Sequence, residues 1–329
     1  MSTESVAVPV TGPATTAPGG GPPPWRRLVR AELRRVLATR AARVGAALIP
    51  LGVLAFGLSK LLLHDADTTA AHRRAEERFR QFQADALEFD LPTDPAVTAR
   101  HFFDDPRYLM ESLSFADLRT LITALAAVAV VFGIFGGGTD WSSRVMLTLS
   151  TAEPRRFRLF GTRALLVTAL AMGVTAVAGA LLVPLLLLAA ATRGSTAGLD
   201  GTYWSVLGSQ YARGVVLVGL LALLGHALAV LTRRTSFALT VAFLYLASAD
   251  RIFAGRGPRL AEYDMDGLVF AVLNEKPVIP LEESDCIAGP GCESVHVDLT
   301  AADGFVGVLL HLLPVLALAV WRSTRTDIG

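Results

Sequence analysis

Six stretches of the chain are almost wholly apolar, and charged, polar stretches separate them. A helix needs about 20 apolar residues to cross a bilayer core of about 30 Å, and each stretch comes close to that length. The predicted spans are residues 44–63, 121–138, 164–191, 214–231, 235–249 and 304–321. The third is long and contains Pro184, so we expect it to be tilted or kinked. The fifth is short, and its continuation through Asp250 and Arg251 to Ala254 is the alternative. The pattern predicts an all-α integral membrane protein with six transmembrane helices.

Composition supports a membrane location. Of the 329 residues, 52% are apolar and 18% are charged, whereas soluble domains carry about 25% charged residues. The net charge is +1, so no basic excess indicates a nucleic-acid partner, and we expect none.

Basic residues predict the orientation, because positive charge stays on the cytoplasmic side. With the amino terminus inside, the cytoplasmic segments hold 16 basic and 5 acidic residues, against 14 and 24 elsewhere. These segments are 1–43, 139–163, 232–234 and 322–329. Both termini are then cytoplasmic, and two long loops, 64–120 and 250–303, lie outside.

The residues before the first span divide into two parts. Residues 1–24 are rich in Ser, Thr, Pro and Gly and contain no basic residue, so we expect a disordered cytoplasmic tail and no secretory signal. Residues 25–43 combine an apolar helical stripe with arginines on other faces, which predicts an amphipathic helix in the headgroup layer. A simple arginine-rich stop before the span is the alternative. The residues of interest are Trp25, Arg26, Arg27, Glu32, Arg34 and Arg35.

The outer loops contain two features. Residues 66–89 are polar with helical spacing and predict a helix above the membrane. Cys286 and Cys292 are the chain's two cysteines and lie on the predicted oxidising side, so we expect a disulfide between them. With only His296 nearby, no metal site is expected.

The sequence lacks the motifs that several functional classes require. The two lysines, Lys60 and Lys276, do not follow glycine, so no Gly-Lys-Ser/Thr phosphate loop exists. The chain contains no HExxH or GxSxG motif. The predicted spans contain no Asp or Glu, which disfavours an ion-driven carrier. His226 and His311 lie near span centres; they are functional candidates, or histidines hydrogen-bonded to a neighbouring helix.

Glycines end the second predicted span. Gly136, Gly137 and Gly138 lack a following lysine, so we interpret them as close helix packing or a hinge. Gly133 and Gly137 also form a small-xxx-small pair.

The predicted cytoplasmic loop 139–163 has the most distinctive pattern. Val145, Met146 and Leu149 form an apolar stripe at helical spacing, and arginines follow the Glu153-Pro154 pair. A short helix projecting into the cytosol would suit a partner's groove. An amphipathic helix on the lipid surface is the alternative.

This loop resembles the corresponding loop of ATP-binding cassette (ABC) type-2 transporter permeases, the membrane subunits of bacterial exporters. The two patterns align without insertions or deletions, and the matching positions are Gly138, Asp140, Trp141, Leu149, Thr151, Glu153, Pro154, Arg155, Arg156 and Arg163. The family has Glu where this chain has Asp140, Gly-Thr at Arg144-Val145, and Lys at Arg163. The family's elbow helix resembles the amphipathic stretch around Ala31-Glu32-Leu33. The family's closing motif resembles the carboxyl-terminal Trp-Arg-Ser-Thr-Arg-Thr-Asp, so the resemblance covers residues 25–329.

The resemblance implies a six-span domain over 44–329 that exports a substrate using a separate ATPase. ATP and magnesium would bind that partner, and this chain would hold no cofactor. The residues implied to contact the ATPase are Asp140, Trp141, Arg144, Glu153, Pro154, Arg155 and Arg156. It also implies pairing as a homodimer or a heterodimer with a similar permease. The apolar spans favour a lipophilic or amphipathic substrate. The arginine-for-lysine and alanine-rich usage favours a high-GC bacterium, whose plasma membrane is then the expected location.

A second hypothesis belongs to another class. The outer loops are long enough for a membrane-anchored sensor or scaffold that acts through them and has no partner ATPase. A membrane enzyme is disfavoured, because no nucleophile, base or metal constellation is visible.

Overall fold

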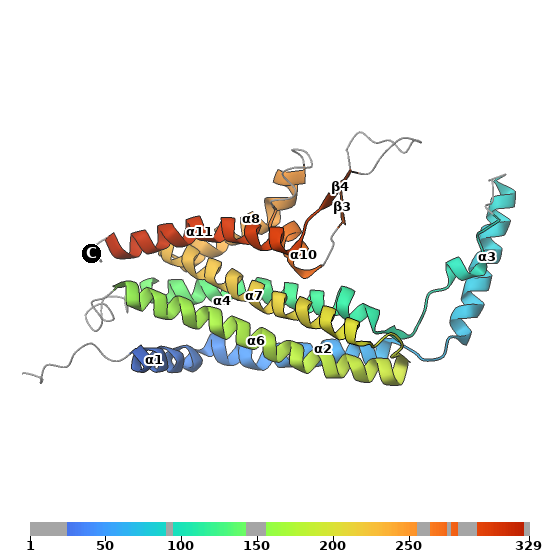
Figure 1. Ribbon diagram of the computed structural model, residues 1–329, viewed down its shortest axis with the longest axis horizontal. Helices are drawn as coiled ribbons and strands as arrows, with labels where there is room; N and C mark the ends of the chain where they lie inside the picture. The colour runs from blue at the N-terminus through green and yellow to red at the C-terminus, as the bar shows by residue number, and fades with distance from the viewer. Residues whose placement is uncertain are drawn as a thin grey trace, which may run out of the picture.

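Five long apolar helices lie side by side along one axis (Figure 1). The computed structural model describes residues 25–89, 95–142, 156–254, 264–274, 278–281 and 295–325. The five helices are α2 (Arg40–Leu63), α4 (Leu118–Ser142), α6 (Arg156–Arg193), α7 (Gly201–Thr232) and α11 (Ala301–Arg325). Each is long and apolar enough to cross a membrane. The protein is therefore mostly helical, as the hydrophobic pattern predicts, and its helices indicate a multi-pass membrane protein.

The remaining predicted span, 235–249, lies in α8 (Thr235–Ala254). The apolar part of this helix among the described side chains is Thr235–Tyr245. The whole helix has 20 residues, about 30 Å at about 1.5 Å per residue, so its backbone has the length of a bilayer core. Among the described residues, five helices are both long and apolar enough to cross a membrane; the side chains of α8 beyond Tyr245 lie outside the described residues.

The chain nevertheless returns from one end of the bundle to the other between α7 and α11. The carboxyl ends of these two helices lie together, as a hydrogen bond of 2.6 Å from the Arg322 side chain to the Leu231 carbonyl shows. A short helix, α10 (Met265–Leu273), packs through Leu268 on Gly304 and Gly307, near the start of α11. Residues 233–300 therefore connect opposite ends of the bundle (Figure 1).

Glycines allow α4 and α7 to approach closely. These two helices form the most extensive contact between elements. A Cβ at Gly133 would lie against the Ala222 carbonyl oxygen, and one at Gly137 would lie 2.6 Å from the His226 carbonyl oxygen. From the other side, a Cβ at Gly225 would meet the Val130 carbonyl oxygen. The Gly133–Gly137 pair is thus a helix-packing surface, as its small-xxx-small spacing suggests.

We expect Gly133→Ala and Gly173→Ala to change stability in opposite directions. Alanine is favoured over glycine in a helix by up to about 1 kcal/mol, and a Cβ at Gly173 meets open space. At Gly133 the added methyl would force backbone apart and cost about 1–3 kcal/mol. Thermal unfolding of the detergent-purified variants, followed by tryptophan fluorescence, measures both. Equal unfolding temperatures for the two variants would contradict close packing at Gly133.

The segments between the long helices form smaller elements at the ends of the bundle. The predicted helix over 66–89 is confirmed as α3 (Thr69–Glu88), which stands away from the bundle (Figure 1). The short elements η1 (Ala99–Phe102) and η2 (Leu113–Asp117) precede α4. Between them, β1 (Tyr108–Leu109) pairs in parallel with β2 (Gly194–Ser195). Strands β3 (Val278–Leu281) and β4 (Val295–Asp298) form an antiparallel pair.

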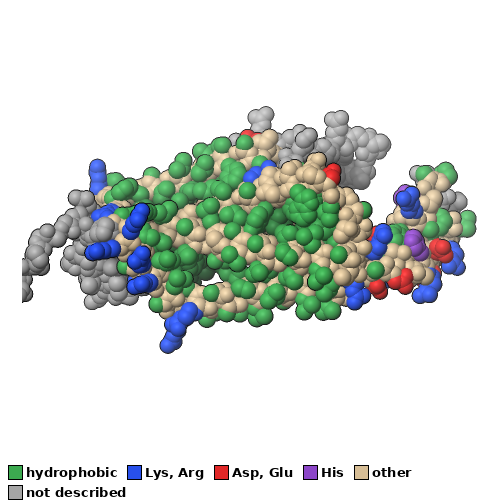
Figure 2. Space-filling model, turned by 60° about the horizontal axis from the view of Figure 1, so that its bottom comes forward, with side chains coloured by type: hydrophobic (Ala, Val, Ile, Leu, Met, Phe, Trp, Pro, Cys, Tyr) green, Lys and Arg blue, Asp and Glu red, His purple; other side chains and the backbone are tan. Residues whose placement is uncertain are grey.

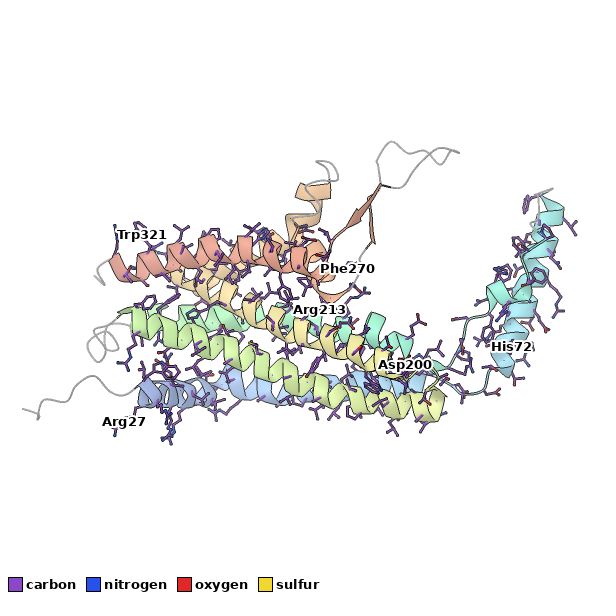
Figure 3. All side chains as sticks on the ribbon, in the orientation of Figure 1. Arg27, His72, Asp200, Arg213, Phe270 and Trp321 are labelled. Carbon is purple, nitrogen blue, oxygen red and sulfur yellow. The ribbon has the colours of Figure 1, made fainter. Side chains whose placement is uncertain are left out.

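Charged side chains gather at the ends of the bundle. The face shown in Figure 2 is largely apolar along its length, with Lys and Arg at one end and charges of both signs at the other. Figure 3 places Arg27 and Trp321 at the first end and Asp200 near the second. We call them the arginine end and the α3 end. An apolar middle between charged ends matches the layering of a bilayer.

Candidate functional site

The amphipathic stretch 25–43 forms α1 (Trp25–Ala38) and the first turn of α2. Thr39 separates the two helices, since its extended backbone leaves its hydroxyl to accept a 3.2 Å hydrogen bond from the Ala42 N–H. This contact caps α2. Trp25 is 49% exposed. The side chains of Arg26, Arg27 and Arg34 are also exposed.

Glu32 behaves differently from its neighbours on α1. Its side chain is only 4% exposed and accepts hydrogen bonds from two arginines. The Arg35 Nε lies 2.8 Å from Oε2, and the Arg163 Nη2 lies 3.2 Å from Oε1. Arg163 belongs to α6 and is also buried. We call Arg35, Glu32 and Arg163 the arginine–glutamate triad; it attaches α1 to α6.

The position of Arg163 gives the triad its significance. Arg163 is the last residue of loop 139–163 as defined from the sequence, and it lies in the second turn after α6 begins at Arg156. The triad therefore fixes the return arm of this loop to α1. Movement of that arm would be resisted by, or passed to, α1.

The other predicted docking residues lie at the edges of this region. Asp140 and Trp141 are in the last turn of α4, and Arg156 begins α6; their side chains are not described. Arg144, Glu153, Pro154 and Arg155 lie outside the described residues, so their predicted roles stay predictions. Both ends of the loop emerge at the arginine end of the bundle (Figure 1).

His226 is buried beside the glycine contact. Its residue is 1% exposed. The ring centroid lies 5.5 Å from that of Phe160 on α6, and a Cβ at Gly137 would lie 3.2 Å from the ring Nδ1. The imidazole is thus enclosed between α4 and α6, which is a packing position near the arginine end.

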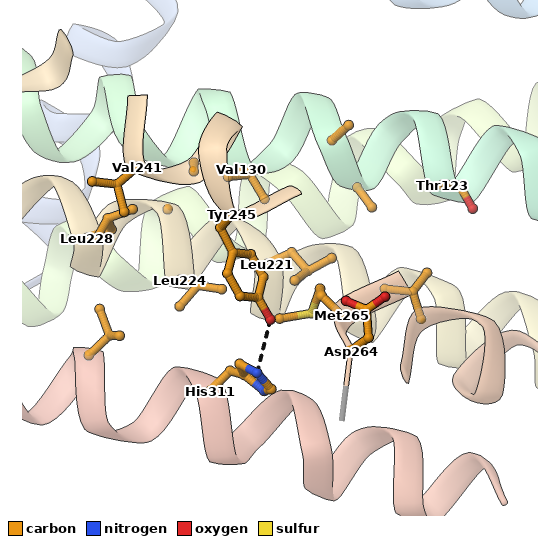
Figure 4. Close-up of a pocket in the computed structure, with 16 residues that line it drawn as sticks. Thr123, Val130, Leu221, Leu224, Leu228, Val241, Tyr245, Asp264, Met265 and His311 are labelled. Carbon is orange, nitrogen blue, oxygen red and sulfur yellow. Dashed lines mark hydrogen bonds between the residues drawn. The ribbon is translucent and has the colours of Figure 1, made fainter. Parts of the chain in front are cut away.

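His311 lies on a cavity between α4, α7, α8, α10 and α11. The cavity has a volume of about 540 Å³, within the range of about 300–1,000 Å³ typical of ligand sites. Its described lining is mostly aliphatic, and the polar members are Thr123, Tyr245, Asp264 and His311. Figure 4 shows Tyr245 reaching from α8 to His311 on α11, with Asp264 beside them.

The ring of His311 makes two hydrogen bonds. Nδ1 lies 2.9 Å from the Gly307 carbonyl, which can only accept, so Nδ1 carries the hydrogen. In the neutral ring, Nε2 then accepts from the Tyr245 hydroxyl at 3.1 Å. This bond between α8 and α11 is what the helix-packing interpretation of His311 predicts.

A buried polar network joins the end of α2 to β1 and η2 at the α3 end. Lys60 Nζ lies 2.8 Å from Asp117 Oδ1, and the Tyr108 hydroxyl donates to Oδ2 at 2.7 Å. Asp117 is 2% exposed and Tyr108 fully buried. Burial, with the hydrogen bond to Asp117, raises the pKa of Tyr108 well above its usual range, so the hydroxyl remains a donor.

We expect Asp117→Asn to destabilise the protein by about 2–3 kcal/mol, because a hydrogen-bonded charge is lost while Lys60 stays half-buried. Thermal unfolding in detergent measures the loss. Asp85→Asn, at an exposed position of α3, is the matched control and should be neutral. If both substitutions shift the unfolding temperature equally, the network contributes nothing specific.

Arg213 is a half-buried cation that the predicted spans did not include. The sequence places it one residue before the fourth span, but α7 begins at Gly201 and carries it inside the helix (Figure 3). Its Nε and Nη2 atoms are buried and have no hydrogen-bond partner among the residues that the structure describes. The sequence signal that could have placed Arg213 in the helix was a single arginine directly before an apolar run.

Comparison with known proteins gives no relative: no family model, curated protein or solved structure matches the chain. Cys286 and Cys292 lie outside the described residues, in the segment that joins β3 to β4. Among the described residues, no group of three His, Cys, Asp or Glu is placed to hold a metal ion.

Proposed function

We propose that this chain is the membrane-spanning permease subunit of an ATP-driven exporter of the ABC type-2 class. A separate ATPase would dock on loop 139–163 at the arginine end, which would be cytoplasmic. The permease would work as a homodimer or a heterodimer in a bacterial plasma membrane and would move a lipophilic or amphipathic substrate. ATP and magnesium would be held by the ATPase.

The observation that supports this proposal most is the arginine–glutamate triad. The loop that resembles the family's docking loop returns through Arg163, and Glu32 of the amphipathic α1 binds that residue. Two segments selected independently from the sequence are thus in contact. A docking loop needs such an anchor, because force applied to a loop with a free arm would be lost in local motion.

The route of the chain supports six crossings. Residues 233–300 connect opposite ends of the bundle, and α8 starts this passage next to the end of α4, where a Cβ at Gly138 would meet Thr235. Six crossings would place both termini on one side, and α1 and the end of α11 do lie at the same end (Figure 1).

The test is purification of this chain from its native membranes in mild detergent, with mass spectrometry of the proteins that accompany it. We expect a stoichiometric cytosolic protein bearing a GxxxxGK[ST] motif. If no nucleotide-binding protein co-purifies, and cross-linking from loop 139–163 also captures none, the exporter proposal is wrong.

A second candidate is a sensor or scaffold acting through the segments at the α3 end. It is favoured by α3, which stands away from the bundle and ends beside exposed Leu87 and Phe89, 84% and 68% exposed. Under this alternative the purification would yield a partner bound through α3 and no ATPase.

A further inference from the structure

We propose that the cavity between α4, α7, α8, α10 and α11 binds a lipophilic cation, meaning an apolar body with one positive charge. That such a molecule is the exported substrate rests on the proposed function; that the cavity binds it does not.

The size and lining favour a bulky apolar ligand. Aliphatic side chains from α4, α7 and α8, including Val130, Leu221, Leu224 and Val241, face a space of about 540 Å³. Removing a ligand's apolar surface from water contributes about 25 cal/mol per Å². Aliphatic side chains offer no hydrogen-bonding groups, so this wall fits hydrocarbon or aromatic groups better than a sugar or a nucleotide.

The polar end of the cavity favours positive charge. Among its described lining residues, Asp264 carries the only acidic group, and neither Lys nor Arg is present. Asp264 is 7% exposed, and a carboxylate in a low-dielectric site attracts a cation far more strongly than one in water. The neighbouring rings of Tyr245 and His311 lie 6.1 Å apart. An aromatic face adds attraction for a cation.

The opening of the cavity favours entry from the side. Thr123 and Ala127 line the cavity, lie one turn apart on α4, and are exposed. They belong to the apolar flank of a helix long enough to cross a membrane. A molecule that has already partitioned into the bilayer would reach the cavity there without passing through water, as a lipophilic cation can.

The test compares two probes of nearly the same size and shape but opposite charge, tetraphenylphosphonium and tetraphenylborate. The full chain is held in nanodiscs of uncharged phosphatidylcholine, and binding of tritiated tetraphenylphosphonium is measured against empty nanodiscs. We expect saturable binding that unlabelled tetraphenylphosphonium displaces and tetraphenylborate does not. Equal displacement by both probes would overturn the proposal.

Two variants locate the site. Asp264→Asn keeps the size of the side chain but removes its charge, and we expect affinity to fall by about tenfold or more, equivalent to about 1.4 kcal/mol. Ala242→Trp would fill the cavity and abolish binding. Asp85→Asn removes a charge from the exposed face of α3 and should bind as the unmodified chain does. If Asp264→Asn binds normally, the carboxylate has no part in recognition and the proposal fails.

The probe comparison on the unmodified chain decides the question even if a variant does not fold. It also needs no ATPase. If tetraphenylphosphonium does not bind but an ATPase co-purifies, the lipophilic-cation site is refuted and the exporter proposal stands. If tetraphenylphosphonium binds but no ATPase co-purifies, the cation site stands and the exporter proposal is refuted.

Discussion

Replacing Glu32 with glutamine is expected to detach α1 from α6 and to lower the free energy of unfolding by about 3 kcal/mol. Removing one partner of a buried ion pair costs about 3–5 kcal/mol, because the other charge stays buried. Arg163 is 7% exposed at its side chain, whereas Arg35 is 37% exposed and can turn to water. The lower end of the range therefore applies. Thermal unfolding of the variant in detergent gives the measurement.

A charge exchange separates the ion pair from the general effect of changing a side chain. Glu32→Arg and Arg163→Glu should each destabilise the protein, while the double variant should recover much of the loss, giving a coupling energy between the two positions. Arg34→Gln is the matched control, because Arg34 is exposed on the same helix. We expect it to change stability by no more than about 0.5 kcal/mol. Additive losses in the double variant would mean that the triad does not hold α1 in place.

The placement of the five long apolar helices could be predicted because it depends on local hydrophobicity. A run of apolar residues must satisfy its backbone internally in a bilayer, so length and composition suffice to locate a helix. The ends are harder to predict. Asp200 caps α7 by accepting a 2.7 Å hydrogen bond from the Tyr203 N–H, which extends the helix well before the apolar run begins at residue 214. Arg213 was therefore assigned to a loop rather than to a helix interior.

The contacts that form the candidate site could not be predicted from local patterns. Glu32 and Arg163 are 131 residues apart in the chain, and the hydrophobic pattern around either residue does not identify the other as its partner. Lys60, in the last turn of α2, and Asp117, the last residue of η2, are likewise distant in the chain and meet only in the fold. One clue was present: Glu32 is the single acidic residue among seven arginines in residues 25–43. An isolated charge of opposite sign in such a run indicates a specific partner.

The cavity depends on still more distant elements. Its polar end combines Tyr245 on α8, Asp264 before α10 and His311 on α11. Both predicted span histidines are buried or hydrogen-bonded, but only His311 lines this cavity. The absence of Asp and Glu from the predicted spans argued against an ion-driven carrier. Asp264 escaped that argument because it belongs to a loop in the sequence and to the wall of the bundle in the fold.

The second large effect is expected at the loop itself. Reversing Arg155 and Arg156 to glutamate should abolish retention of the ATPase and leave the permease inserted and folded. Each reversal places a negative charge where the proposed partner meets a positive one, and unfavourable charge contacts in an interface cost several kcal/mol. Arg163 remains in place, so the triad and the attachment of α1 should survive. Co-purification with the ATPase and the unfolding temperature of the variant measure the two effects separately.

Arg73→Glu with Arg74→Glu is the matched control, because these adjacent arginines are exposed on α3, at the opposite end of the bundle. It changes the net charge of the chain by the same amount and should retain the ATPase. Loss of the ATPase only in the Arg155/Arg156 variant assigns docking to the loop. Loss only in the α3 variant would place the partner at the α3 end and favour the sensor. Retention in both would contradict docking through these arginines, because no surface that held an ATPase by their charge could tolerate its reversal.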